Sequence, residues 1–173
     1  MDFFDIVKTR QSVRVFAPKP VEPDKLQAML EAAELAPSAG NRQAYEIYVV
    51  RDPSRKAALR KAALDQESVS AAPVALVFCA DPERSAQRYG ERGAHRYSLQ
   101  DATIACTFAM LAATALGLDS VWVGAFDDEA VRRAIGASAD KVPVAILPVG
   151  YGAEKPGRRP RRPLAELVRE VGG

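Results

Sequence analysis

The sequence predicts an α+β or α/β fold in which helices pack against a central sheet. Short runs rich in β-branched and aromatic residues alternate along the chain with longer runs of helical spacing. Of the 173 residues, 48% are apolar and 27% are charged, a balance suited to one sizeable hydrophobic core. No internal repeat or linker interrupts the alternation, so residues 1–173 are expected to form a single domain.

The first half of the chain contains one strong helical pattern and two predicted strands. The run VEPDKLQAMLEAAELA predicts a helix that has Pro23 in its first turn and ends at Pro37. The runs YEIYVV (45–50) and PVALVFCA (73–80) are predicted strands, the second of them buried on both faces. The basic stretch between them, RKAALRKAALDQE, is expected to be helical. The apolar residues at helical spacing in the first helix are Leu26, Met29, Leu30, Ala33 and Leu35.

A long apolar helix is the main feature of the second half. Its start is placed at Ser98, because Ser98 and Asp101 have the spacing of a capping box, and it runs to Gly117. Since nearly every side of it is apolar, we expect it to be buried all round, with a second subunit completing the core. Before it, residues 81–97 are strongly polar and show no clear period, which predicts a surface excursion or short helices.

Two further strands, one more helix and a basic tail complete the pattern. The runs DSVWVGAF (119–126) and VPVAILPVGYG (142–152) are predicted strands. Asp127 is the predicted cap of the helix DDEAVRRAIG between them. The acidic residues at this helix start are explained by capping and by the helix dipole, so they are given no catalytic role. The tail combines a Pro/Arg loop with a final short helix.

Composition argues against several classes of partner. With 24 basic and 22 acidic residues the net charge is +2, so no global field favours nucleic acid or a membrane. The N-terminus MDFFDIVKTR lacks a signal-peptide pattern, and no apolar run approaches the ~20 residues of a membrane span. A cytoplasmic protein is therefore expected. Cys79 and Cys106 lie in apolar runs without metal or redox spacing and are interpreted as buried, reduced thiols.

Protein side chains alone offer little catalytic chemistry in this sequence. The only histidine, His95, lies in a charged stretch typical of a solvated loop, so nucleophilic schemes lack a well-placed base. A zinc site of His and Cys is not expected from one histidine and two separated cysteines. The common phosphate-binding glycine motifs are also absent. A bound cofactor is therefore the expected source of reactivity.

Two polar stretches near the N-terminus are candidate binding segments. In TRQSVRVF (9–16), Arg10, Ser12 and Arg14 recur at every second residue, which places two guanidinium groups and a hydroxyl on one face of an extended chain. This pattern fits an anion clamp and a solvated basic strand equally well. The stretch APSAGNRQAYE (36–46) lies between a helix and a strand and is either an ordinary loop or a loop whose polar atoms face a ligand.

Four motifs in order resemble the nitroreductase family of flavin enzymes. They are TRQSVRVF, APSAGNRQAYE, the apolar helix followed by GLDSVWVGAF, and PVGYG followed by RRPRRPL. The resemblance covers nearly the whole chain and is to the short form of the family. It implies an α+β fold with three α/β/α layers around a mostly antiparallel sheet. It also implies an interlocked homodimer that binds one FMN at each of two sites along the subunit interface.

The resemblance also implies which residues bind the cofactor. Arg10 would bind the FMN phosphate, Ser12 would support phosphate and ribityl, and Arg14 would lie by the pyrimidine edge of the flavin. A cation there stabilises the negative charge of reduced flavin. The full implied set is Arg10, Gln11, Ser12, Arg14, Pro37, Ser38, Ala39, Asn41, Val123, Gly124, Ala125 and Arg162, with no metal and no catalytic side chain.

Three of the implied contacts come from other parts of the chain or from the partner. The Pro37–Asn41 motif would reach the flavin from the other subunit. The backbone amides around Gly124 would approach flavin N5 and O4, and the small residue there permits close approach. Arg162 would close on the phosphate.

The sequence also departs from the family pattern in several places. Ala44 and Tyr45 stand where the family usually has Pro-Trp, and no acidic residue accompanies Gly124. Pro160 stands where a lysine is common in some members. Gln66 is a candidate for the family's mid-chain flavin contact.

The resemblance implies an FMN-dependent NAD(P)H oxidoreductase that passes hydride from NADH or NADPH to a nitroaromatic, quinone or activated alkene. An alternative is a flavin-binding or flavin-sensing protein, or a specialised member such as a dehalogenase or flavin-fragmenting enzyme. A third hypothesis is a domain that binds nucleic acid through its tail, although few aromatic residues accompany the basic cluster there. That cluster is Arg158, Arg159, Arg161 and Arg162.

Overall fold

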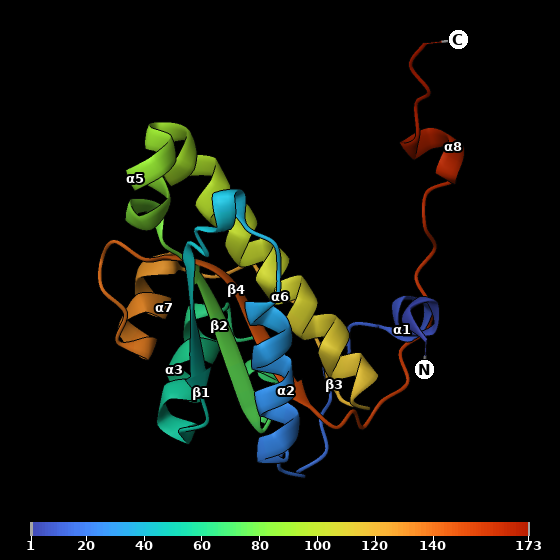
Figure 1. Ribbon diagram of the computed structural model, residues 1–173. Helices are drawn as coiled ribbons and strands as arrows, with labels where there is room; N and C mark the ends of the chain where they lie inside the picture. Colours follow the sequence, from blue (N-terminus) through green and yellow to red (C-terminus); the bar gives the residue numbers. More distant parts are fainter. Residues whose placement is uncertain (1, 173) are drawn as a thin grey trace.

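Helices and strands alternate along the chain much as the sequence predicts. The computed structural model describes residues 2–172 (Figure 1). A single 3-10 turn, η1 (Ala39–Asn41), precedes the first strand, and a π-helical turn, η2 (Gly93–Tyr97), joins α5 to α6. The α-helices are α1 (Phe3–Thr9), α2 (Pro23–Glu34), α3 (Pro53–Ala62), α4 (Glu67–Ala71), α5 (Pro82–Arg92), α6 (Ser98–Ala115), α7 (Asp128–Ile135) and α8 (Leu164–Leu167).

Four strands form one antiparallel sheet between two layers of helices. Their order is β1-β2-β4-β3, with β1 at Tyr45–Val50, β2 at Val74–Ala80, β3 at Asp119–Ser120 and β4 at Val142–Gly150. Every residue of β2 is buried, as predicted. Leu76 and Phe78 belong to the hydrophobic cluster formed with α2 and α6, whereas Val77 belongs to the cluster formed with α3 and α7. The expected α+β fold with α/β/α layers is confirmed.

The strand predicted at 119–126 is much shorter than expected. It pairs with β4 over only two residues and makes one further bridge, between Val123 and Ile146. The position between these contacts faces Pro148, which has no N–H to donate to a neighbouring strand. The regular ladder therefore stops there, and the residues after Val123 leave the sheet.

The predicted capping box at Ser98 is wrong. Ser98 lies within a continuous run of helical backbone, because the π-helical turn η2 leads directly into α6. Its hydroxyl donates a 2.7 Å hydrogen bond to the carbonyl of Ala94, one turn earlier. Asp101 therefore does not cap this helix, and its carboxylate is available to another part of the chain.

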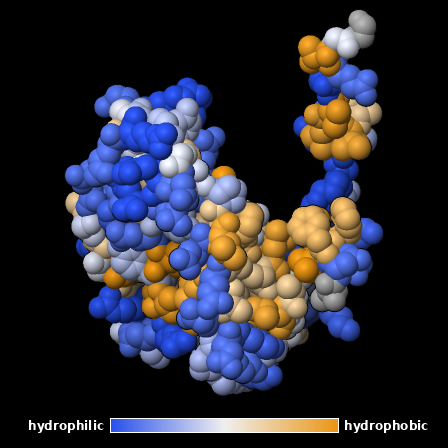
Figure 2. Space-filling model, in the orientation of Figure 1, coloured by the Kyte–Doolittle hydropathy of each residue, from blue (hydrophilic) through white to orange (hydrophobic). Residues whose placement is uncertain are grey.

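One further expectation about a helix needs correction, and a second depends on a partner subunit. Helix α2 ends at Glu34, and Leu35, predicted for its buried face, is 80% exposed where the chain turns toward Pro37. Helix α6 is buried on one side only within the chain, since Leu99 and Phe108 are each 37% exposed, and the expected burial of its other side by a second subunit stays a prediction. Figure 2 shows apolar residues gathered over the lower half of α6, over α1 and on the arm that carries α8.

Several local predictions are confirmed. Asp127 caps α7 by accepting a 2.6 Å hydrogen bond from the N–H of Ala130. His95 is exposed and lies 2.8 Å from Glu91. Cys79 and Cys106 are buried and free, and burial raises the pKa of the Cys79 thiol to about 12. None of the helices in residues 2–172 is long and apolar enough to cross a membrane.

Residues 154–172 form an arm that leaves the body of the chain. Figure 1 shows α8 standing apart from the sheet and its helices, with α1 near the base of the arm. Leu164, Leu167 and Val171 on this arm are all largely exposed. Apolar side chains on an extended segment need a covering surface, which the described part of this chain does not supply.

Candidate functional site

The segment after α1 runs extended beside the end of β3. Ser12 forms a parallel bridge with Ser120, and the N–H of Val13 donates to the carbonyl of Ser120 at 3.1 Å. Val13 and Phe16 are buried and fix the segment against the body. The side chains of the predicted anion clamp are therefore presented from a well-anchored piece of backbone.

Polar groups on this segment lack protein partners. Within residues 2–172, the Arg10 side chain makes no hydrogen bond or ion pair, and the Arg14 guanidinium reaches only the carbonyl of Ser12, at 3.5 Å. The side-chain oxygen of Gln11 is buried without a partner. A buried acceptor without a partner costs roughly 1–3 kcal/mol unless something else satisfies it. The segment therefore offers a ligand the free guanidinium donors of Arg10 and Arg14 and the free acceptor of Gln11.

The backbone around Gly124 also leaves donors free. Val123 is buried at its bridge to Ile146, whereas Gly124 and Ala125 are exposed. In the described part of the chain, the N–H groups of Gly124 and Ala125 have no acceptor. The Gln66 side-chain amide donates to the carbonyl of Ala125 at 3.3 Å, so this candidate does contact the loop.

The loop at residues 37–44 is held by Asp101. Its buried carboxylate accepts hydrogen bonds from the N–H of Ala39 at 2.9 Å and from the N–H of Ala44 at 3.3 Å. The loop contains left-handed backbone at Gly40, Asn41 and Gln43, a conformation that glycine and asparagine tolerate best. The unusual composition of this stretch is explained in part by this tight turn.

Ser38 and Asn41, two of the predicted ligand residues in this loop, differ from each other in whether their side chains are already hydrogen-bonded. The Ser38 hydroxyl accepts a 3.0 Å hydrogen bond from the N–H of Gln43, so it helps to close the loop. Asn41 is exposed, and its side chain makes no hydrogen bond with the described residues. Of the two, only the Asn41 amide is fully available to an outside group.

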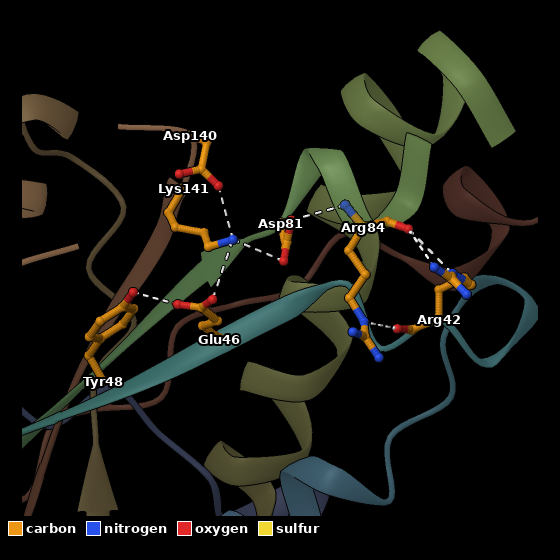
Figure 3. A network of polar contacts seen from close by, with 7 residues as sticks. All are labelled: Arg42, Glu46, Tyr48, Asp81, Arg84, Asp140 and Lys141. Carbon is orange, nitrogen blue, oxygen red and sulfur yellow. Dashed lines mark hydrogen bonds and ion pairs between the residues drawn. The ribbon is translucent and has the colours of Figure 1, made fainter. Parts of the chain in front are cut away.

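A network of charges lies at the end of the sheet where the 37–44 loop enters β1. Lys141 lies 3.3 Å from Glu46, 3.0 Å from Asp81 and 3.0 Å from Asp140 (Figure 3). Burial alone would lower the pKa of Lys141, but hydrogen bonds to Asp81 and Asp140 outweigh it and raise the pKa. This cluster joins β1, the end of β2 and the start of β4.

An apolar cleft opens beside the loop. Its volume is about 600 Å³. Pro37, Ser38 and Ala39 form one wall, and the other wall comes from η2 and the first turns of α6. The residues on that second wall are Tyr97, Leu99, Gln100, Asp101, Thr103 and Ile104.

Two groups of the predicted site residues lie apart on one chain. The loop and its cleft lie at the N-terminal end of α6, beside Asp101, whereas Arg10 and Ser12 lie beside β3, which follows the C-terminal end of α6. At about 1.5 Å per helical residue, the two groups are roughly 20 Å apart. Figure 1 shows η1 and α1 at opposite ends of this helix.

Arg162 belongs to neither group within the chain. It lies on the arm, where its guanidinium contacts Glu166, and the described residues show no contact between it and Arg10 or Ser12.

Sequence reasoning missed Asp101, which was assigned to a helix cap, and Tyr97, which lay in a stretch without an assigned structure. The i+3 spacing from Ser98 concealed the role of Asp101, because the same pattern fits a cap.

Comparison with known proteins gives a consistent result. The family model described as "Nitroreductase family" matches residues 7–82 and 64–151. A Thermus thermophilus protein named NADH dehydrogenase is 34% identical over 186 residues, covering 92% of this chain and 91% of its own. A Bacillus subtilis protein named as an NAD(P)H FMN reductase is 29% identical over 168 residues, covering 88% of this chain and 67% of its own. A nitroreductase family protein from Streptococcus pneumoniae superposes with a TM-score of 0.89 at 25% identity, covering 98% of this chain and 100% of its own.

Proposed function

Since this chain belongs to the nitroreductase family, we propose that it is an FMN-dependent NAD(P)H oxidoreductase. When bound, FMN would accept hydride from the nicotinamide nucleotide and pass it to an oxidised acceptor such as a nitroaromatic, quinone or activated alkene. Relatives named NADH dehydrogenase and FMN reductase support the class of reaction. The whole chain is proposed to act as one flavin-binding domain.

The unpartnered polar groups on the extended segment carry the proposal. Arg10 and Ser12 offer a guanidinium and a hydroxyl suited to a phosphate, and the orphaned oxygen of Gln11 fits a hydroxyl or ring N–H donor. Arg14 would supply positive charge beside the ring, which favours the reduced, anionic form. The free N–H groups of Gly124 and Ala125 would donate to acceptors at the ring edge.

The separation of the two groups of residues supports a homodimer. Within one chain, the Arg10 segment and the loop bearing Asn41 lie roughly 20 Å apart, at opposite ends of α6. A second copy that presents its loop to the first copy's Arg10 segment brings both groups to one cofactor. The exposed apolar face of α6 and the apolar arm provide the surfaces for such an assembly, and the arm would carry Arg162 to its place.

The absorbance spectrum of the purified protein, with and without added FMN, tests the proposal. We expect a flavin band near 450 nm that bleaches anaerobically with NADH or NADPH and returns on addition of a quinone. Arg10→Gln is expected to raise the dissociation constant for FMN at least about tenfold, the loss of one charge-assisted phosphate contact. Arg51→Gln is the control, because Arg51 is exposed and its side chain makes no hydrogen bond or ion pair with the described residues.

Three outcomes contradict the proposal or select the alternative. A protein that binds no FMN overturns it. Bound flavin that neither nucleotide reduces favours a flavin-binding or sensing role. Equal FMN affinity in wild type and Arg10→Gln would remove Arg10 from the site.

A further inference from the structure

The cleft beside the 37–44 loop is bordered by four arginines with no acidic partner. We call Arg42, Arg84, Arg88 and Arg92 the arginine rim. None of them has a carboxylate within 4.0 Å among residues 2–172. The chain as a whole is nearly neutral, at +2, so this concentration of positive charge is local. Figure 2 shows the surface over α5, at the top of the view, as strongly hydrophilic.

The rim is built onto the walls of the cleft. Arg88 donates a long, 3.4 Å hydrogen bond to the carbonyl of Gly40, and Arg92 donates at 2.8 Å to the hydroxyl of Tyr97, a cleft residue. Figure 3 shows Arg42 and Arg84 exchanging hydrogen bonds through backbone carbonyls, which joins the loop to α5. Arg88 and Arg92 therefore touch residues on or next to the cleft, and Arg42 and Arg84 are bonded to each other where the loop meets α5.

Two tyrosines hold these guanidinium groups in place. Tyr89 and Tyr97 meet edge to face, with ring centroids 5.1 Å apart. The guanidinium carbon of Arg88 lies 5.4 Å from the Tyr89 ring, and that of Arg92 lies 5.4 Å from the Tyr97 ring. Each guanidinium has five N–H donors, so most donors of Arg88 and Arg92 remain free for an anion.

We propose that the arginine rim binds the phosphate groups of the nicotinamide nucleotide that donates hydride. This inference rests on the proposed function. A reduced nicotinamide nucleotide has flat rings joined through a pyrophosphate, which matches an apolar cleft with a cationic border. On the proposed arrangement, the ring that donates hydride approaches the flavin next to the Asn41 loop, and the rim borders the same loop through the bond from Arg88 to Gly40.

The test compares two hydride donors, one with phosphates and one without. The first donors are NADH and NADPH, and the second is N-benzyl-1,4-dihydronicotinamide, which has no phosphate. In the double variant Arg88→Gln/Arg92→Gln we expect kcat/KM for the nucleotides to fall at least about tenfold, with KM rising more than kcat falls. For the phosphate-free donor, kcat/KM is expected to stay within about twofold, as are FMN content and KM for the quinone acceptor.

Binding measurements give a readout independent of turnover. Calorimetry with oxidised NADP⁺ is expected to show a higher Kd in the double variant than in wild type. Inorganic pyrophosphate is expected to compete with NADPH for the wild-type protein but not for the variant. The corresponding double Arg→Lys variant, which keeps the charge, should recover part of the affinity. Arg51→Gln, at the far end of β1 from the loop, is the control and should behave as wild type in every assay.

Each remaining outcome counts against the rim. If kcat/KM of the double variant falls equally with both classes of donor, the arginines act on the fold or on the flavin, and the inference is wrong. If neither donor is affected, the phosphates bind elsewhere. If only the KM for an acidic acceptor changes, the rim serves the acceptor. A protein whose flavin is reduced by no donor refutes the proposed function, and the inference with it.

Discussion

The Asp101 carboxylate accepts a 2.9 Å hydrogen bond from the N–H of Ala39, a residue 62 positions earlier in the chain. A second bond, from the N–H of Ala44, uses its other oxygen. One buried acid on α6 therefore fixes both ends of the loop that carries Asn41. The shape of the loop depends on this contact between distant segments and not on its own sequence alone.

Replacing Asp101 with Asn is expected to loosen the loop. The amide keeps one acceptor but turns an N–H₂ toward one of the two backbone donors, which leaves that buried donor without a partner. The free energy of unfolding should fall by roughly 1–3 kcal/mol in urea denaturation, and FMN retention should weaken as well. Asp128→Asn, at an exposed position of α7, is the matched control and should change stability little. Unchanged stability and FMN binding in Asp101→Asn would show that the loop holds its shape without the carboxylate.

Gly40 is expected to tolerate no side chain for two separable reasons. Its φ is +53°, and an added Cβ would collide with the Tyr89 hydroxyl. Gly117 has a similar φ of +73° but open space around it. Gly117→Ala should therefore cost only backbone strain, about 1 kcal/mol, and Gly40→Ala clearly more, as measured by thermal denaturation.

A double-mutant cycle with Tyr89→Phe separates the two reasons at Gly40. Removing the hydroxyl relieves the collision but not the backbone strain, so part of the loss in Gly40→Ala should be recovered. Full additivity of the two substitutions would mean that Tyr89 does not press on the loop.

Replacement of Lys141 should destabilise the chain in a pH-dependent way. Hydrogen bonds from Ser138 and Lys141 lower the pKa of Asp140 from 3.8 to about 2. A depressed carboxyl pKa contributes stability that is present above about pH 4 and is lost as the pH falls toward 2. In Lys141→Met, the cation shared by three carboxylates is missing, so the free energy of unfolding should fall by roughly 1–2 kcal/mol at pH 7.

The gap between Lys141→Met and wild type should narrow between pH 4 and pH 2, as the carboxylates become protonated. Melting temperatures recorded across this range measure the effect. Lys61→Met, at an exposed lysine without an acidic partner among the described residues, should show no such narrowing. A gap that stays constant with pH would mean that Lys141 acts through packing alone.

Charge on the exposed face of α6 is expected to separate the proposed dimer. Phe108 is 37% exposed on this face, and Phe108→Asp would place an unpaired carboxylate in an apolar interface. Sedimentation velocity should show a monomer, and the monomer should retain little FMN. Leu64→Asp, at an apolar residue 73% exposed elsewhere, is the control. A Phe108→Asp monomer that holds FMN as tightly as wild type would contradict a site shared between subunits.

Two patterns that depend on local chemistry were read correctly from the sequence, whereas the local capping pattern at Ser98 was not. The buried strand at 74–80 and the cap at Asp127 follow from residues close together in the chain. The strand at 119–126 was overestimated, because its interruption depends on Pro148 in the strand opposite. The role of Asp101 was missed for the same reason, since its partners lie in a distant loop.

The arginines of residues 81–97 give a different lesson. They were described as having no clear period, although Arg84, Arg88 and Arg92 recur at every fourth residue, the spacing of one helix face. The pattern was obscured because glycines and a π-helical turn interrupt the segment and because basic residues are usually assigned to solvent. Only their position beside the cleft distinguishes them from an ordinary exposed surface.

The placement of the Arg10 segment and the Asn41 loop at opposite ends of α6 has a genetic consequence. On the proposed arrangement, each site in the dimer takes Arg10 from one copy and Asn41 from the other. An Arg10 variant and an Asn41 variant, each defective alone, would therefore complement one another when co-expressed. A mixed dimer collects both defects in one site and leaves the other site fully wild type.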